Sequence, residues 1–471
     1  MDKSDSTPLV LDVDGTLLRS DLLYETFWAA MGRDIRRTLR LCLFGWRTPA
    51  RLKRDLLGLA EPEFELLPVR QELLDMALVA RKAGRPVHLA SGADQTLVDG
   101  LAAFLGFAGQ HFGSTPDRNL TGPAKAAQLT DRFGQGGFDY AGNAPDDLDT
   151  WKAARRVIAV SPDPALSARI AALEKPTQIL SDGWTLKDLV REMRPRHWIK
   201  NLLLFLPLLA AHRLDLGAVL PVTVAFLAFS LSASSIYIAN DLLDLDSDRR
   251  HPEKRNRPIA SGLLPIRTAM FVGAGLAAIA LAIAYSVAPM VAAMTLAYIV
   301  ATLVYSLWLK HLRWLDIVTL AVLFLMRVLT GAVAAQTDIS GWLIGVVFAV
   351  FLSLAVAKRF SALTRAFRGR HLPGRGYDHN DLGPLRFVAY TSILAAGVQM
   401  LVYVASDEVR GLYDSTAVLA FLVVPVVLWL VRMIRLSELG REDYDPVVFV
   451  TRDRASLLLA GFGIAIILLA I

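Results

Sequence analysis

The sequence predicts two fold classes in one chain: an α/β domain of the Rossmann-like type with a small helical cap, then an all-α polytopic membrane domain of about nine transmembrane helices. Apolar and charged residues are mixed through residues 1–190, whereas long apolar runs fill most of the remainder. The chain is 54% hydrophobic, and its mean hydropathy of +0.42 is too high for a purely soluble protein. We expect the α/β domain over residues 1–180, an amphipathic linker over 181–197 and the membrane domain over 198–471.

Two acidic residues follow the first apolar strand of the N-terminal domain. Residues 9–17 read Leu-Val-Leu-Asp-Val-Asp-Gly-Thr-Leu, so Asp12 and Asp14 come at the end of a buried strand, just before a turn glycine. Carboxylates at the carboxyl end of a parallel strand face the crevice in which α/β sheets bind ligands. This edge of the sheet is therefore a candidate catalytic site, and residues 22–67 are predicted to form a small cap over it.

At these residues the chain resembles the haloacid-dehalogenase (HAD) superfamily of phosphotransferases, whose first motif is DxDGT. The later motifs of that family are matched in order along the chain, by Ser91 after the strand 86–90, by Lys125 within 122–125, and by Asn143 and Asp147 within 140–147. Four motifs in the family order are far more specific than DxDGT alone. The alternative is a decayed HAD fold that acts only as a tether.

The resemblance implies a role for each of these side chains. Asp12 would attack phosphorus and form an aspartyl-phosphate, and Asp14 would protonate the leaving alcohol and then activate water. Ser91 and Lys125 would hold the transferred phosphoryl oxygens. The implied ligands of Mg²⁺ are Asp12, Asp14, Asn143 and Asp147. The family usually has Asp where Asn143 stands, and an uncharged amide should weaken metal binding, which makes Asp147 the better ligand candidate.

The second half of the chain contains nine apolar stretches that are candidates for crossing a bilayer. They are residues 198–211, 216–239, 266–285, 288–308, 314–335, 341–357, 386–405, 414–431 and 455–471. One alternate set of the loops between them carries many Lys and Arg residues, whereas the opposite set carries only Arg213 and Arg410. The positive-inside rule places the basic loops and the N-terminal domain in the cytoplasm. This topology explains the net charge of +6 better than binding of nucleic acid does.

An acidic segment directly follows the second of these stretches. Residues 240–248 read Asn-Asp-Leu-Leu-Asp-Leu-Asp-Ser-Asp. On a helix, Asn240, Asp244, Asp248 and Asp241 fall at about 0°, 40°, 80° and 100°, on a single stripe. A carboxylate at mid-membrane costs roughly 2.5–3.5 kcal/mol, and clustered like charges repel one another. A divalent cation that holds a diphosphate removes both penalties. We therefore interpret Asp241, Asp244 and Asp248 as metal ligands with Asn240 beside the substrate, against the alternative of a solvated acidic loop.

With this NDxxDxxxD stripe, residues from about 190 to 471 resemble the UbiA-type intramembrane prenyltransferases, all-α proteins whose carboxylates bind Mg²⁺ and a diphosphate. The sequence looks most like the branch that transfers phosphoribose from phosphoribosyl diphosphate to a polyprenyl phosphate. Relatives that prenylate aromatic rings usually carry a second aspartate-rich motif before the fifth span, where Asp316 is the only acidic residue here. This departure favours the phosphoribosyl branch.

The resemblance also implies the substrate contacts. The residues expected to bind phosphate groups or ribose are Lys200, Asn201, Asn240, Lys254, Arg257, Tyr305, Lys310, Asp316, Arg327, Lys358 and Arg359. Arg327 lies about half-way along its span and is expected to face the cavity, because it cannot easily reach the bilayer surface. For Asp316 two interpretations stay open: a contact with ribose hydroxyls or a metal, or an ion pair with Arg313.

The two resemblances together imply a bifunctional, Mg²⁺-dependent enzyme. One half would transfer 5-phosphoribose from phosphoribosyl diphosphate to a polyprenyl phosphate, and the other would remove the 5-phosphate, giving polyprenyl-phosphoryl-ribose for cell-envelope glycans. The protein would be a multi-pass protein of the bacterial inner (plasma) membrane with a cytoplasmic HAD domain, and homo-oligomers are compatible with it. Two alternatives remain: a UbiA-type enzyme that uses a prenyl diphosphate and an aromatic or lipid acceptor, with a separate HAD role, and a transporter-like bundle with a regulatory HAD domain.

Overall fold

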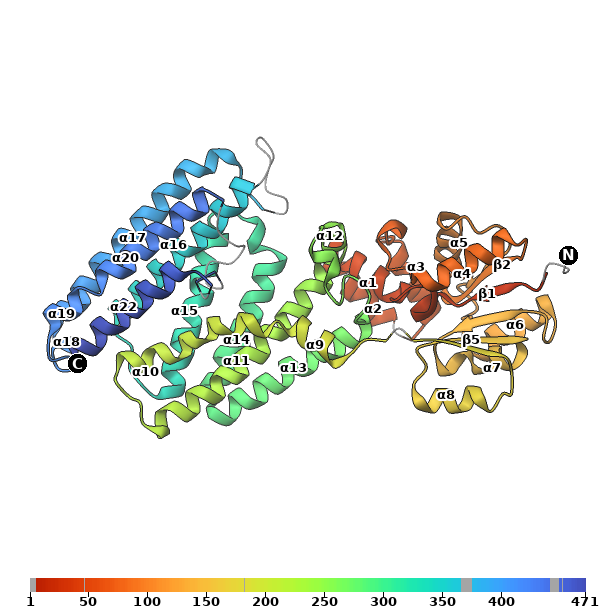
Figure 1. The fold of residues 1–471 in the computed structure, drawn as a ribbon, viewed down its shortest axis with the longest axis horizontal. Helices are drawn as coiled ribbons and strands as arrows, with labels where there is room; N and C mark the ends of the chain where they lie inside the picture. The colour runs from red at the N-terminus through yellow and green to blue at the C-terminus, as the bar shows by residue number, and fades with distance from the viewer. Residues whose placement is uncertain (1–5, 46, 182, 366–374, 441–448, 451) are drawn as a thin grey trace. The chain divides into compact units, whose positions relative to one another are not determined.

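The structure is a computed structural model that describes residues 6–45, 47–181, 183–365, 375–440, 449–450 and 452–471 (Figure 1). The chain divides into two compact units. The first unit consists of Met1–Met193 together with Tyr237–Val272, and the second of Arg194–Ile236 together with Gly273–Ile471. The segment that contains the acidic stripe therefore belongs to the first unit, although the residues on both sides of it belong to the second.

The first unit is built on a parallel six-stranded sheet in the order β3-β2-β1-β4-β5-β6. The strands are β1 Leu9–Leu11, β2 Val87–Asp94, β3 Phe112–Ser114, β4 Asp139–Gly142, β5 Arg156–Val160 and β6 Thr177–Leu180. The strand order reverses at β1, which lies between β2 and β4, and ligands of parallel α/β sheets bind at the carboxyl ends of the strands at such a point. This sheet confirms the α/β class predicted for the N-terminal region.

Helices cover both faces of the sheet, because successive side chains of each strand point to opposite sides. Leu9 and Leu11 pack in one apolar cluster with helices α4 (Gln71–Lys82) and α5 (Gln95–Phe104), whereas Val10 packs in another. The second cluster contains side chains of α6 Pro123–Phe133, α7 Leu148–Ala153 and α8 Pro164–Ala171. Three helices fill the region predicted as a cap: α1 Leu22–Arg33, α2 Ile35–Gly45 and α3 Pro49–Leu57. Helix α9 (Leu186–Met193) ends the first part of this unit.

Residues 237–272 are attached to the α/β body by two kinds of contact. This segment contains the end of α11 (Leu216–Leu243), helix α12 (Leu245–Arg250) and the start of α13 (Ile266–Val287). Arg249 of α12 donates two hydrogen bonds to the carboxylate of Glu25 on α1, at 2.9 and 2.7 Å. Gly262 has φ +72°, and a Cβ atom there would lie 2.7 Å from Pro68 Cγ. The backbone of this segment therefore packs directly against the loop before α4.

The second unit is a helical membrane domain. Its remaining helices are α10 Leu206–Ala210, α14 Pro289–Leu307, α15 Leu315–Ala335, α16 Gly341–Arg365, α17 Leu382–Ala405, α18 Asp407–Arg410, α19 Thr416–Ala420, α20 Val423–Glu438 and α22 Arg454–Ala470. Helices α15, α16, α17 and α20 share one buried apolar cluster. Within it the rings of Phe324 and Phe351 stack with their centroids 4.2 Å apart.

Seven helical segments in the described residues are long and apolar enough to span a membrane, rather than the nine predicted. The last predicted span is the apolar helix α22, which is 17 residues long. The first predicted span, 198–211, is not one α-helix: a 3₁₀ segment covers Pro195–Phe205 and α10 covers Leu206–Ala210. Pro207 lies inside this stretch, and a proline removes one backbone donor of a continuous helix.

Candidate functional site

The first candidate site lies where β1 and β4 end, and a glycine allows the two loops to approach. Asp12 is the residue after β1, and Gly15 turns the chain with φ +73°. A Cβ atom at position 15 would lie 2.3 Å from the amide nitrogen of Asn143, which follows β4. Only glycine fits this turn without displacing Asn143. The hydroxyl of Thr16 contacts both loops, because it lies 2.9 Å from Asp12 Oδ2 and 3.2 Å from Asn143 Oδ1.

Lys125 links the two predicted carboxylates at the centre of this site. Its ammonium group lies 2.7 Å from Asp12 Oδ1 and 3.2 Å from Asp147 Oδ1, and all three side chains are buried. The hydroxyl of Tyr140 donates to Asp147 Oδ1 at 2.7 Å. Asp147 Oδ2 accepts the backbone N–H groups of residues 143 and 144. The Asp147 carboxylate therefore holds the loop after β4 in place and neutralises Lys125.

Asp14 is held by a backbone amide and by the predicted Ser91. Leu22 N donates to Asp14 Oδ1 at 2.8 Å, and Ser91 Oγ donates to Asp14 Oδ2 at 2.6 Å. Ser91 lies on β2, one strand away from Asp14 in the sheet. The Ser91 hydroxyl therefore contacts Asp14, the residue predicted to act as acid and base.

Burial dominates the protonation behaviour of these groups. It raises the pKa of Asp12 to about 7, and the positive charge of Lys125 opposes the shift. Burial, followed by the charge of Asp21, raises the pKa of Asp14 to about 6. Burial by itself lowers the pKa of Lys125, but the charges of Asp12 and Asp147 outweigh it, and the net shift is upward. A carboxyl group that titrates near neutral pH can both give and accept a proton.

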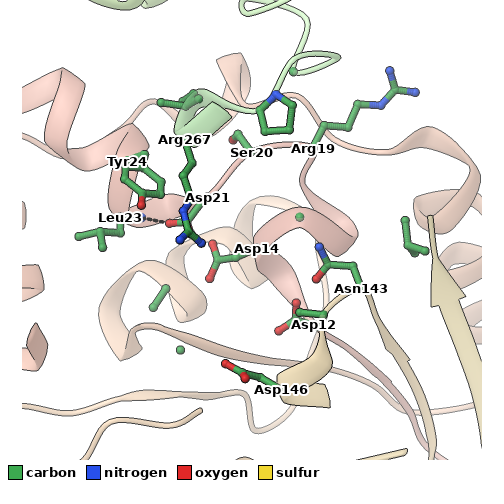
Figure 2. Close-up of a pocket in the computed structure, with 18 of the residues that line it drawn as sticks. Asp12, Asp14, Arg19, Ser20, Asp21, Leu23, Tyr24, Asn143, Asp146 and Arg267 are labelled. Carbon is green, nitrogen blue, oxygen red and sulfur yellow. Dashed lines mark hydrogen bonds between the residues drawn. The ribbon is translucent and has the colours of Figure 1, made fainter. Parts of the chain in front are cut away.

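These side chains line a cavity of about 700 Å³ (Figure 2). Asp12, Asp14 and Lys125 border it on the α/β body, and Lys53 borders it from the cap helix α3. The segment before and at the start of α13 supplies another part of the wall, consisting of Gly262, Leu263, Pro265, Ile266 and Arg267. Figure 2 shows the Arg267 side chain extending toward Asp14 and Asp21. Because α13 is one of the candidate membrane spans, a single cavity joins the carboxylates to the first turn of a span.

Several charged residues of the cavity were not selected by the sequence analysis, among them Asp146, Lys53 and Arg267. Asp146 lines the same cavity as Asn143. The sequence contained evidence for it, because it directly precedes Asp147 within the motif at residues 140–147. Lys53 and Arg267 carried no signal of their own, since each is a basic residue distant in sequence from every motif. Asp147 stays a prediction as a metal ligand, but its carboxylate already accepts the contacts described above, which makes Asp146 a second ligand candidate.

The acidic stripe is the second candidate site, and it also belongs to the first unit. Asp241 and Asp248 are both buried, and the guanidinium of Arg257 bridges them: Nη1 lies 3.0 Å from Asp241 Oδ1 and also contacts Asp248 Oδ2. Lys254 Nζ lies 3.5 Å from Asp248 Oδ1. Asp244 lies between α11 and α12, with non-helical backbone angles. The structure thus brings four of the predicted residues into one charged cluster.

The membrane unit contains two further clusters of predicted residues. In the first, Arg327 is buried and donates to Asn201 Oδ1 at 3.0 Å, to the Leu323 carbonyl at 2.5 Å and to the Tyr298 hydroxyl at 2.7 Å. Asn201 in turn donates to Ser230 Oγ at 3.0 Å. The guanidinium also lies 4.8 Å from the centroid of the Tyr298 ring. These protein groups therefore already engage the Arg327 guanidinium, and its role as a phosphate ligand stays a prediction.

The second cluster is centred on Asp316, which is fully buried. Arg359 contacts both of its carboxylate oxygens, and Arg375 Nη1 lies 2.9 Å from Oδ1. The Tyr305 hydroxyl donates to Asp316 Oδ1 at 2.8 Å. The ion pair with Arg313 that was one interpretation of Asp316 is not formed, because Arg313 pairs with Asp381 at 2.7 Å. The remaining predicted residues Lys200, Lys310 and Lys358 are half-buried and also belong to this unit.

The residues of the acidic stripe suit a divalent cation by chemistry. Among the residues that the structure describes, no group of three or more His, Cys, Asp or Glu side chains is arranged to hold a metal ion. However, the Oδ1 atom of Asn240 is buried without a hydrogen-bond partner in the described part of the chain. Oxygen atoms of carboxylates and amides are the donors that Mg²⁺ prefers. Asp241 and Asp248 already share one positive group, Arg257, so the cluster is adapted to hold positive charge.

Fold and sites together define a multi-pass helical membrane protein that carries an α/β unit with a carboxylate-lined cavity. Its sequence matches the profile of the UbiA prenyltransferase family over residues 202–370. The uncharacterized protein y4nM of Sinorhizobium fredii is 33% identical over 455 residues, which cover 95% of this chain and 88% of that protein. The chain therefore belongs to the UbiA prenyltransferase family, and the UbiA half of the predicted resemblance is confirmed.

Two further comparisons concern the membrane half. A decaprenyl-phosphate phosphoribosyltransferase of Mycolicibacterium smegmatis is 40% identical over 207 residues, which cover 42% of this chain and 64% of that protein. Among solved structures, a UbiA homolog from Archaeoglobus fulgidus bound to GPP and Mg²⁺ matches with a TM-score of 0.46 and 15% sequence identity, covering 59% of this chain and 99% of that one. The HAD half of the sequence interpretation stays a prediction.

Proposed function

We propose that the chain is a bifunctional membrane enzyme that makes and then dephosphorylates a lipid-linked ribose phosphate. The UbiA-type part transfers 5-phosphoribose from phosphoribosyl diphosphate to a polyprenyl phosphate. The N-terminal α/β unit then removes the 5-phosphate as a HAD-type phosphatase, giving polyprenyl-phosphoryl-ribose on the cytoplasmic side of the bacterial inner membrane.

The transferase half of the proposal is supported by family membership and by the name of one relative. UbiA membership supplies the class of reaction, and the Mycolicibacterium smegmatis relative is named for the transfer of phosphoribose to decaprenyl phosphate. The acidic stripe is the proposed site of the diphosphate, with Asp241, Asp244 and Asp248 as the residues that would hold Mg²⁺. When bound, the cation would neutralise the departing diphosphate. Basic residues near the stripe, such as Lys254, are available for phosphate oxygens.

The phosphatase half rests on one observation: the cavity that contains Asp12 and Asp14 is also lined by Ile266 and Arg267, at the start of a membrane span. A substrate in this cavity lies with its phosphate at the carboxylates and its remainder at the membrane surface. A lipid-linked sugar phosphate has this shape, whereas a soluble sugar phosphate would leave the membrane side of the cavity unused.

The proposed chemistry uses Asp12, Asp14 and Lys125, which line the same cavity. A carboxylate oxygen of Asp12 attacks the phosphorus atom, and the bond between phosphorus and the ribose 5-oxygen breaks. Asp14 gives a proton to the departing oxygen, then takes one from the water that hydrolyses the aspartyl-phosphate. Lys125, 2.7 Å from Asp12, stabilises the negative charge of the phosphoryl group. The products are the ribosylated lipid and inorganic phosphate.

The test uses membranes that contain the full chain, with phosphoribosyl diphosphate labelled in the ribose and a polyprenyl phosphate. We expect a labelled, dephosphorylated lipid from the unmodified chain, a labelled lipid that keeps its 5-phosphate from Asp12→Asn, and no labelled lipid from Asp241→Asn. Asp75→Asn, at an exposed position on α4, is the matched control and should behave like the unmodified chain.

Two results would contradict the proposal. If label enters lipid only from a prenyl diphosphate and an aromatic acceptor, the membrane half is a prenyltransferase of the other kind. If Asp12→Asn still yields dephosphorylated lipid at the normal rate, the α/β unit is not the phosphatase. Mass spectrometry of the lipid separates these outcomes.

A further inference from the structure

Helix α2 of the cap presents large apolar side chains to solvent. Leu39, Leu43 and Phe44 are 51%, 68% and 76% exposed, respectively. At 100° per residue they fall at about 0°, 40° and 140°, all on the exposed half of the helix. Apolar groups gathered in this way on an otherwise charged helix usually mark a surface that contacts a partner or a membrane.

The same side of the helix is strongly basic. Arg36, Arg37 and Arg40 are exposed, and Arg33 precedes them at the end of α1. Within residues 33–45 the only acidic residue is Asp34, whose side chain accepts the N–H of Arg37 at the start of the helix. Arginines interleaved with exposed Leu and Phe are typical of helices that lie in the headgroup region of a bilayer. Each such basic residue is attracted to anionic lipids.

The opposite side of α2 is packed, which fixes the direction in which the apolar surface points. Leu41 and Cys42 contact a small core that contains Ala30 of α1 and Leu56 of α3. The exposed surface is therefore presented by a helix that the cap holds firmly.

Contacts within the first unit place the start of α2 beside the end of a membrane span. Gly32 and Arg33, at the end of α1, line a cavity of about 280 Å³ together with Leu242 and Leu243, the last residues of α11. Helix α2 begins two residues after Arg33. Helix α1 is also joined to α12 by the buried Glu25–Arg249 pair. Since α11 is a candidate span, the start of α2 lies beside the end of a helix that enters the bilayer.

We propose that α2 is a membrane-surface helix: Leu39, Leu43 and Phe44 enter the headgroup region of the bilayer, and Arg36, Arg37 and Arg40 bind the phosphates of anionic lipids. A bilayer fits this surface better than a second copy of the chain does. In a two-fold contact between two α2 helices, arginines would face arginines, and like charges at close range repel. The inference does not depend on either proposed enzymatic activity.

The test uses the full chain in lipid nanodiscs, with one chain per disc. Cys42 is the only cysteine of the chain, so Cys42→Ser with Phe44→Cys allows an environment-sensitive fluorophore to be attached at position 44 alone. The matched control carries the label at an exposed position of α8, Ala168→Cys, in the same background. Discs of phosphatidylcholine are compared with discs that also contain phosphatidylglycerol.

We expect the emission of the label at position 44 to shift to shorter wavelength and to be quenched by lipids that carry a nitroxide near the headgroup. The shift should be larger with phosphatidylglycerol, and Arg36→Gln with Arg40→Gln should remove this dependence on lipid charge. The label at position 168 should show neither effect. The inference is overturned if the label at position 44 is as accessible to aqueous iodide as the label at 168, or if the shift appears only with two chains per disc.

A second measurement needs no substitution and covers the case in which Cys42→Ser disturbs the cap. Hydrogen exchange of the unmodified chain should show slower exchange in residues 35–45 with phosphatidylglycerol discs than with phosphatidylcholine discs, while exchange in α8 stays unchanged. Equal exchange of residues 35–45 in both kinds of disc would contradict the role of the arginines and would overturn the proposal.

Discussion

Arg267 is the residue through which the N-terminal cavity can distinguish a lipid from a soluble phosphate ester. Of the cavity residues that lie before and at the start of α13, Arg267 alone is basic. The proposed substrate carries two phosphate groups, a monoester on ribose and a diester to the lipid. The Arg267 side chain starts on α13 and extends toward Asp14 and Asp21 (Figure 2). While Asp12 engages the monoester, the Arg267 guanidinium can hold the diester through paired N–H groups.

We therefore expect Arg267→Ala to reduce kcat/KM for the phosphoribosyl lipid while leaving hydrolysis of p-nitrophenyl phosphate unchanged. A hydrogen bond to a charged group contributes about 1.5–3 kcal/mol, which corresponds to roughly ten- to hundredfold in kcat/KM. The measurement is steady-state phosphate release from both substrates by the detergent-solubilised chain.

Arg156→Ala is the control for this substitution, because Arg156 is an exposed arginine on β5 that does not line the cavity. It should leave both rates unchanged. Equal losses on the two substrates in Arg267→Ala would show that the residue supports the cavity in general and does not recognise the lipid.

The sequence could predict which residues of the first site come together, but not which atoms they contact. Asp12 and Asn143 each follow a strand of one parallel sheet, and Ser91 lies within the neighbouring strand β2, so their convergence follows from topology. Their partners depend on loop geometry that no motif encodes. Ser91 contacts Asp14, and the Asp147 carboxylate is engaged by Lys125 and two backbone amides.

At the scale of elements, helix α1 connects the two candidate sites of the first unit. Its first residue, Leu22, donates its N–H to Asp14, and one turn later Glu25 forms the buried pair with Arg249. Arg249 adjoins Asp248 of the acidic stripe. A displacement of α1 would therefore change the surroundings of both carboxylate groups, and the Glu25–Arg249 pair fixes its position.

Breaking this pair should destabilise the chain strongly. Glu25→Gln leaves the guanidinium of Arg249, which is 9% exposed, without its counter-charge, and such a loss costs about 3–5 kcal/mol. Arg249→Met should have a similar effect, and the double variant should lose less than the sum of the two. The measurement is the thermal unfolding of the chain in detergent, followed by intrinsic fluorescence.

A pair of arginine and glutamate at the surface provides the control for this double-mutant cycle. Arg386 and Glu438 are in contact at 2.8 Å, but the arginine side chain is 60% exposed. Glu438→Gln should therefore change stability by only about 0–1 kcal/mol. If Glu25→Gln lowers the melting temperature no more than Glu438→Gln does, the Glu25–Arg249 pair between α1 and α12 does not stabilise the cap.

Hydrophobic pattern predicted the long helices well and their interruptions poorly. Most stretches of about 20 apolar residues became a single helix, because the backbone of a span must satisfy its own hydrogen bonds, whereas 414–431 is divided between α19 and α20. The single acidic stripe expected over 240–248 is divided at Asp244 between α11 and α12. Asp241 and Asp248 still lie close together, because the Arg257 guanidinium forms an ion pair with each of them. The periodicity of apolar residues cannot predict this contact.

At the scale of the whole molecule, the chain passes between the two units at three points, after residues 193, 236 and 272. The membrane spans α11 and α13 therefore lead into and out of the first unit. This connection keeps the α/β unit at the membrane, and a tether of this kind raises the effective concentration of one site at another to about the millimolar range. The division could not be predicted from sequence, where residues 237–272 read as a loop between two spans.

The three passages predict that the linker before the membrane domain is not what holds the α/β unit in place. An N-terminal fragment of residues 1–193 lacks Arg249, and it also lacks Gly262, which packs against Pro68. It therefore loses the buried Glu25–Arg249 pair and the apolar surface that segment 237–272 covers, together on the order of 3–5 kcal/mol. At about 2–4 °C per kcal/mol for a domain of this size, the fragment should melt roughly 10 °C below the α/β unit of the full chain.

A protease site inserted at Gly183 supplies the comparison, because cleavage there in the folded chain leaves residues 237–272 in place. The cleaved α/β part should then copurify with the membrane part and keep its melting temperature. Release of the α/β part on cleavage would show that the linker, and not segment 237–272, attaches it.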